Sequence, residues 1–129
     1  MKSPPRLSVL AALAVLAVTA GAPGGFASAA PGLIERGVYL TAGAGQCADC
    51  HRNGLRGGPN FIPGPPGAPW AKTVPSLRGL TMFKTDAQAA LFLRTGKLPN
   101  GHAARRPMPR YRFNAADAEA IVAYLRSLK

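Results

Sequence analysis

The chain has 129 residues, enough for one domain, and 47% of them are apolar, so they can form a hydrophobic core. The formal net charge is +11, and without Lys2 and Arg6 the remaining 14 basic and 5 acidic residues leave +9. Such a surface favours acidic partners, but the basic residues are spread along the chain without a nucleic-acid-binding motif, so we expect no nucleic acid partner. A basic surface that is merely solvated is the alternative. The two cysteines lie three positions apart, which excludes the disulfide framework of a small secreted protein.

The N-terminus has the pattern of a secretory signal peptide. Lys2 and Arg6 precede an apolar run over residues 7–20, and residues 27–29 form an A-x-A cleavage site. We therefore expect residues 1–29 to be a cleaved signal peptide and residues 30–129 to be one soluble domain in the periplasm or otherwise exported. A retained anchor is the alternative, but the run is shorter than the roughly 20 apolar residues that span a bilayer. The sequence beyond residue 30 contains no apolar stretch that could span one.

The first half of the mature chain has two segments with helical patterns. Residues 33–42 carry apolar side chains at helical spacing, and glycines follow them. Residues 74–80 have room for one short turn of helix that begins at Pro75.

The second half has two stronger helical segments. Residues 85–95 are a helix that Thr85 is suited to cap and Gly96 to end. The last helix begins after a second capping residue, Asn114. Its apolar stripe comprises Ile121, Val122, Leu125 and Leu128.

Two long segments between these helices are irregular. Ten of the sixteen residues from Gly54 to Pro69 are Gly or Pro, which excludes a regular helix or a central strand. Phe61, Ile62 and Trp70 are costly to leave in water, so we expect an ordered loop rather than a disordered linker. Residues 97–112 are again irregular, and no strand pair is expected. The chain is therefore predicted to be all-α, with three or four short helices and long Gly/Pro-rich loops around a flat apolar cofactor that supplies their shared centre.

A single short motif carries the chemistry. Residues 47–51 read Cys-Ala-Asp-Cys-His, the C-x-x-C-H signature of c-type haem attachment. On one helical turn residues i and i+3 share a face, so the thiols of Cys47 and Cys50 can form thioethers with the two vinyl groups of one haem. His51 is then held beneath the iron as its proximal ligand. A thioredoxin-like pair would need a strand–helix pattern that is missing here, and a zinc site would need ligands beyond the one other histidine, His102.

The distal side of the iron needs a second ligand or remains open. The mature chain contains two methionines, Met82 and Met108. Pro107 and Pro109 stiffen the backbone around Met108, and a thioether is a soft ligand that stabilises ferrous iron. We predict Met108 as the distal ligand, with a gap-filling core methionine as the alternative. His102 is a weaker candidate and is more typical of an exposed histidine, and Met82 is expected in the core.

These features resemble the class I cytochrome c family over residues 33–128. The resemblance rests on the C-x-x-C-H motif and on weaker segments in the expected order: RGVYL at 36–40, PSLRGL at 75–80, PMP at 107–109 and AYL at 123–125. It implies the small cytochrome c fold, in which the first and last helices cross at Gly37 and Tyr124. It also implies an electron carrier rather than an enzyme, either free or as the cytochrome subunit of a dehydrogenase. A haem enzyme or gas sensor with an open iron is the alternative.

Three expectations concern the surroundings of the haem. His51 should donate its other ring N–H to a carbonyl, which we place in the loop of residues 57–65. Trp70 and a nearby arginine would bind a haem propionate. Four arginines near Met108 would form a docking collar for an acidic redox partner, such as a dehydrogenase or terminal oxidase. They are Arg105, Arg106, Arg110 and Arg112.

Overall fold

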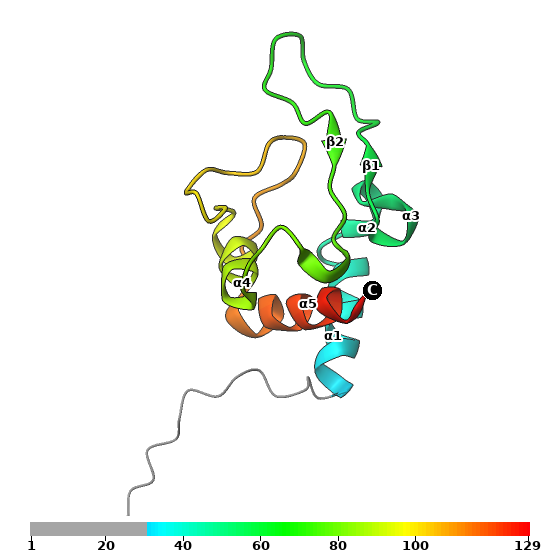
Figure 1. The fold of residues 1–129 in the computed structure, drawn as a ribbon, viewed down its shortest axis with the longest axis vertical. Helices are drawn as coiled ribbons and strands as arrows, with labels where there is room; N and C mark the ends of the chain where they lie inside the picture. Colours follow the sequence, from blue (N-terminus) through cyan, green and yellow to red (C-terminus); the bar gives the residue numbers. More distant parts are fainter. Residues whose placement is uncertain (1–30) are drawn as a thin grey trace, which may run out of the picture.

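A computed structural model describes residues 31–129, so the leader predicted over residues 1–29 lies outside the described residues. This part of the chain is mostly helical, which confirms the predicted all-α class with short helices and long loops (Figure 1). No helix within residues 31–129 has the length and apolar character needed to cross a membrane. The elements in order are α1 (Pro31–Ala42), α2 (Cys47–Cys50), α3 (Arg52–Leu55), β1 (Gly58–Pro59), β2 (Thr73–Val74), the 3₁₀ turn η1 (Arg78–Leu80), α4 (Asp86–Thr95) and α5 (Ala115–Ser127).

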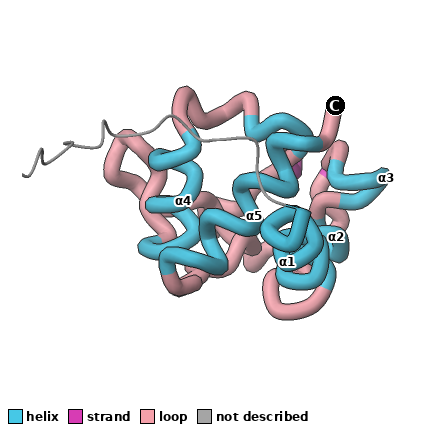
Figure 2. The backbone as a smooth tube through the Cα atoms, turned by 90° about the horizontal axis from the view of Figure 1, so that it is seen from below, coloured by secondary structure: helices cyan, strands magenta, loops and turns pink. Residues whose placement is uncertain are grey.

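Helices α1 and α5 pack directly against each other and form the base of the fold (Figures 1 and 2). Gly37 of α1 is buried at their contact. A Cβ atom at position 37 would lie only 2.6 Å from Cβ of Tyr124 and would also collide with the carbonyl oxygen of Ala120. The backbones approach so closely that only glycine fits, which bears out the expected crossing at Gly37 and Tyr124.

Helices α4 and α5 begin after the capping residues that the sequence predicts, and α4 also ends where predicted. The hydroxyl of Thr85 accepts from the amide of Gln88 at 3.2 Å, and the side chain of Asn114 accepts from the amide of Asp117 at 2.8 Å. Each bond satisfies an amide that the first turn leaves without a partner. Gly96 ends α4 in the left-handed conformation with φ of 69°. The buried face of α5 comprises Ala118, Ala120, Ile121, Val122 and Leu125.

Two sequence predictions about the middle of the chain are wrong. Strands β1 and β2 do pair, antiparallel, with Gly58 opposite Val74 and Pro59 opposite Thr73. Strands of two residues are too short to give the alternating pattern by which a sequence reveals strands. The short turn lies at η1 rather than beginning at Pro75, which directly follows the two residues of β2 that pair with β1.

The Gly/Pro-rich segment is ordered, as expected. The chain from Asn60 to Lys72 joins β1 to β2, and we call it the 60–72 loop. The indole N–H of Trp70 donates to the carbonyl of Ile62 at 2.9 Å, and the side-chain amide of Asn60 donates to the carbonyl of Ala71 at 2.7 Å. In Figure 1 this loop projects away from the helices at the top of the molecule.

Candidate functional site

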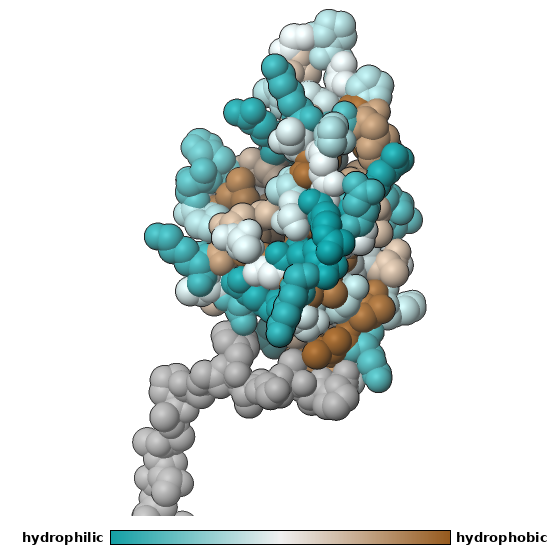
Figure 3. Space-filling model, turned by 45° about the vertical axis from the view of Figure 1, so that its right-hand side comes forward, coloured by the Kyte–Doolittle hydropathy of each residue, from teal (hydrophilic) through white to brown (hydrophobic). Residues whose placement is uncertain are grey.

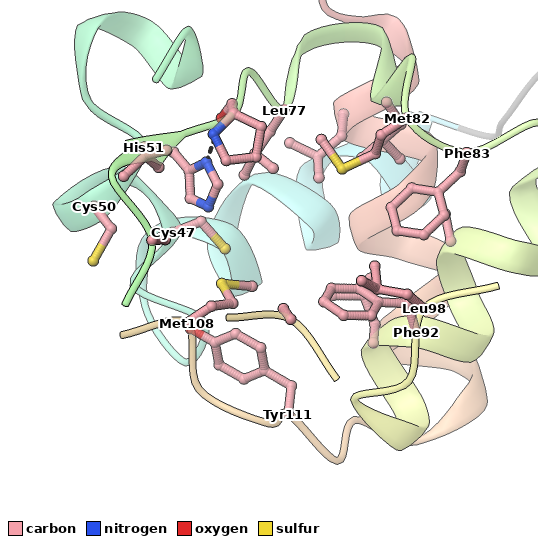
Figure 4. A pocket seen from close by; sticks show the side chains of 18 of the residues that line it. Cys47, Cys50, His51, Leu77, Met82, Phe83, Phe92, Leu98, Met108 and Tyr111 are labelled. Atoms are coloured by element: carbon pink, nitrogen blue, oxygen red, sulfur yellow. Dashed lines mark hydrogen bonds between the residues drawn. The ribbon is translucent and has the colours of Figure 1, made fainter. Parts of the chain in front are cut away.

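A cavity of about 440 Å³ lies where the helices converge (Figure 4). Its volume is in the usual range for a site that binds an organic cofactor. A cavity with an apolar wall thus lies where the sequence predicts that a flat cofactor supplies the shared centre of the helices. Its lining includes Cys47, Cys50, His51, Leu77, Leu80, Met82, Phe83, Phe92, Leu93, Leu98, Met108, Tyr111, Ile121 and Leu125.

The one-turn helix α2 places the two cysteines at this cavity. Both are free thiols; Cys47 is buried and Cys50 is half-buried. In Figure 4 the sulfur of Cys47 points into the space. Burial raises the pKa of Cys47 to about 11, so its thiol is protonated at neutral pH. Within residues 31–129 no three His, Cys, Asp or Glu side chains gather as a metal site would require.

His51 follows directly at the end of α2 and is 4% exposed. Its Nδ1 lies 2.7 Å from the carbonyl oxygen of Pro75 and donates a hydrogen bond to it. Burial lowers the pKa of His51, outweighing the hydrogen bond to Pro75, which raises it. The ring is therefore neutral, and its Nε2 lone pair is free to bind a metal.

The acceptor for His51 differs from the predicted one. We expected a carbonyl between residues 57 and 65, and the structure uses Pro75 instead. The pairing of β1 with β2 brings Pro75 over α2. Gly57, with φ of 75°, makes this approach possible, because a Cβ atom there would lie 2.6 Å from the Pro75 oxygen.

Met108 reaches the same cavity from the irregular segment before α5. Its side chain is half-buried and points into the space, as does the ring of His51 (Figure 4). The structure thus brings together all four predicted site residues. His102 is exposed and is not part of the cavity lining. Met82, expected in the core, is 41% exposed at the cavity wall, so that prediction is wrong.

Tyr111 is a site residue that sequence reasoning missed. It lines the cavity, and its hydroxyl donates to the carbonyl of Gly45, which closes the turn before α2. Burial, with a smaller contribution from Cys47, raises the pKa of Tyr111 to about 12. No local pattern distinguishes this tyrosine, because it stands between two arginines in an irregular segment.

The arginines near Met108 and the indole of Trp70 agree only in part with the sequence predictions. Arg105, Arg106, Arg110 and Arg112 are exposed, and Arg105 also contributes to the cavity lining. Trp70 is not part of that lining, and its indole N–H is already bonded to Ile62. The structure therefore does not support Trp70 as a propionate ligand.

The donor set and the cavity together fit a haem. Two thiols lie one helical turn apart at the wall, and a neutral imidazole and a thioether face the space. The remaining wall is almost entirely apolar, as a flat macrocycle requires. The fold and the site thus define a small all-α haem protein.

A sequence model of the family described as cytochrome c matches residues 34–129, and the chain belongs to the cytochrome c family. Membership supports electron transfer through haem as the general activity and implies haem c as the cofactor. No curated protein and no solved structure gives a significant match.

Proposed function

We propose that this protein is a carrier of single electrons outside the cytoplasm, with one haem attached through Cys47 and Cys50 and ligated by His51 and Met108. It acts as a free carrier or as the cytochrome subunit of a dehydrogenase. The observation that carries the proposal is that His51 and Met108 point into one apolar cavity (Figure 4), and that the lining of this cavity includes both Cys47 and Cys50.

Each residue has a distinct part. Haem supplies a one-electron Fe(III)/Fe(II) couple when it is bound. The two cysteines tether it, so that opening of a loop does not release it. The Pro75 carbonyl holds His51 with Nε2 towards the cavity, and the thioether of Met108 favours the reduced state. If His51 and Met108 both held the iron, no coordination position would remain for a substrate, and the protein would transfer electrons without being an enzyme.

The proposed location outside the cytoplasm rests on the predicted leader, residues 1–29. We propose that residues 1–29 direct export and are removed, so that the mature protein begins at Ala30 in the periplasm or an equivalent compartment. The charged start, the apolar run and the A-x-A site support this. Sequencing the N-terminus of protein purified from the producing cells tests it, and an intact Met1 would contradict it.

The surface around Met108 favours an acidic redox partner. Residues 97–112 contain five basic side chains and no acidic one, and four of the five are the exposed arginines near Met108. Opposite charges accelerate the encounter of two proteins and are screened by salt. Transfer to the partner should slow as ionic strength rises, and a rate that does not depend on salt would contradict an acidic partner.

The decisive experiment is the far-red absorption of the ferric protein, where a methionine–iron charge-transfer band appears. Met108 and Met82 both line the cavity, so Met82→Ala is a matched control for Met108→Ala. We expect the band in the wild type and in Met82→Ala, and its loss in Met108→Ala together with rapid binding of carbon monoxide to the ferrous form. If the wild type lacks the band and binds carbon monoxide readily, the alternative of a haem enzyme or gas sensor with an open iron replaces the carrier.

A further inference from the structure

The 60–72 loop is a projection that carries no charged side chain from Asn60 to Ala71, on an otherwise basic molecule. Residues 60–71 include no Asp, Glu, Lys or Arg, although the whole chain carries a net charge of +11. Residues 63–67 are all exposed, and Phe61 is 45% exposed. In Figure 3 the upper tip is pale, of intermediate hydropathy, with strongly hydrophilic side chains below it. A projection with this composition is suited to enter a recess in another protein rather than to form ion pairs.

Contacts within the loop hold it in one conformation. Gly64 packs against Trp70 so closely that a Cβ atom at position 64 would collide with the indole ring, 2.6 Å from its Cδ2 atom. The amide of Ala68 donates to the carbonyl of Pro65 at 3.1 Å, which closes the tip. Four prolines further limit the backbone. A loop that is already ordered loses little conformational entropy on binding, and exposed proline-rich segments fit grooves lined by aromatic side chains.

The base of the loop lies beside the cavity. Ala71 and Thr73 line the cavity, and the amide of Ala71 donates to the carbonyl of Arg106 at 2.7 Å. The guanidinium carbon of Arg52 lies 3.4 Å from the ring centroid of Phe61, so a positive charge flanks the base on its other side. A protein that holds the loop down to its base would therefore border the cavity that Met108 lines.

We propose that the 60–72 loop is the element that selects the redox partner. The partner is a protein with an uncharged recess lined by aromatic side chains, which receives the tip, and an acidic rim, which faces Arg52, Arg105 and Arg106. Charge brings the two proteins together, and the loop decides which acidic protein stays bound. This inference rests on the proposed electron-transfer function.

The test compares one added charge at two places. Pro66→Glu puts a carboxylate on the tip, and Leu91→Glu puts the same charge on α4, at an apolar residue that is 54% exposed and outside the cavity lining.

The partner is captured first. A photo-crosslinking residue at position 61 captures it from extracts of the producing cells, with position 91 as the reference. The captured protein is then purified, and its affinity for and electron exchange with each variant are measured. The rate of electron exchange with a hexaammineruthenium complex, which does not require docking to the loop, is measured for each variant as a control.

Burying an unpaired carboxylate in an uncharged recess is costly, so Pro66→Glu should weaken binding and kcat/KM with the captured protein by about tenfold or more. Leu91→Glu should change both by less than about threefold, in keeping with screened surface charge. Both variants should react with the ruthenium complex as the wild type does and retain its far-red band.

Three outcomes would each overturn the inference: equal effects of the two variants, no effect of either variant, or no preferential crosslinking at position 61. Failure of the wild type to react with the ruthenium complex would instead contradict electron transfer itself.

Discussion

The amide of Ala71 donates a hydrogen bond of 2.7 Å to the carbonyl of Arg106, and this bond joins the 60–72 loop to the segment that carries Met108. Trp70, the residue before Ala71, also forms a bridge with Arg106. Because Trp70 is held in turn by Ile62 and Gly64, the internal packing of the loop is connected to the position of the thioether. The loop thus supports the distal side of the cavity in addition to any role in docking.

This connection predicts that Gly64→Ala loosens the Met108 segment. The new Cβ atom would lie 2.6 Å from Cδ2 of the Trp70 indole, so the ring must move and the Ala71–Arg106 bond weakens. We expect faster hydrogen exchange at the Ala71 amide and a weaker far-red band. Gly67→Asn is the control, because nothing lies within 4 Å of position 67 and Asn tolerates its φ of 77°. Unchanged exchange at Ala71 in Gly64→Ala would show that the loop and Met108 are independent.

A second pair of glycines tests the contact between α1 and α5. At Gly37 a Cβ atom would lie 2.6 Å from that of Tyr124, so Gly37→Ala forces the helices apart and should cost about 2 kcal/mol or more of unfolding free energy. Gly32 is in the same helix with nothing within 4 Å, so Gly32→Ala should be neutral or stabilise by up to about 1 kcal/mol. Urea unfolding of both variants measures the difference. Equal stability of the two would mean that the helices do not meet at Gly37.

The features that sequence predicts well here depend on neighbouring residues. Thr85 and Asn114 cap their own helices, and the C-x-x-C-H motif brings its three functional groups together within one turn. These features need no knowledge of the rest of the fold. They were sufficient to place α4, α5 and the thiols.

The features that sequence missed depend on contacts between distant segments. The partner of His51 is Pro75, 24 residues away, and it is in place only because β1 pairs with β2. Met82 is an apolar residue of the kind expected in a core, yet it is 41% exposed at the cavity wall, a position that distant segments determine together. Tyr111 bonds to Gly45 across 66 residues, which no local pattern indicates.

The C-terminal end of α5 holds a half-buried polar centre at Arg126. Its guanidinium donates to the carboxylate of Asp86 at 2.7 Å and to the carbonyl of Phe83 at 3.0 Å, and also to the carbonyls of η1. Arg126→Met would leave these acceptors without a partner and should cost about 2–4 kcal/mol of unfolding free energy. Arg36 forms an ion pair with Asp117, but its side chain is 54% exposed, so Arg36→Met should cost less than about 1 kcal/mol. Denaturant midpoints of the two variants, compared at equal m-values, test the contrast. A larger loss from Arg36→Met would contradict it.

The two thiols provide a test of tethering that is separate from ligation of the iron. Cys47 and Cys50 both line the cavity, and neither is needed to hold His51, whose ring is oriented by Pro75. Cys47→Ala and Cys50→Ala should each retain haem through one thioether after denaturation in acidified acetone, whereas the double variant should release it. The more deeply buried Cys47 contributes to the packed wall, so its loss should also lower the unfolding free energy more than loss of Cys50. Release of haem from the denatured wild type would exclude covalent attachment. Retention by the double variant would mean that a residue other than these two forms the link.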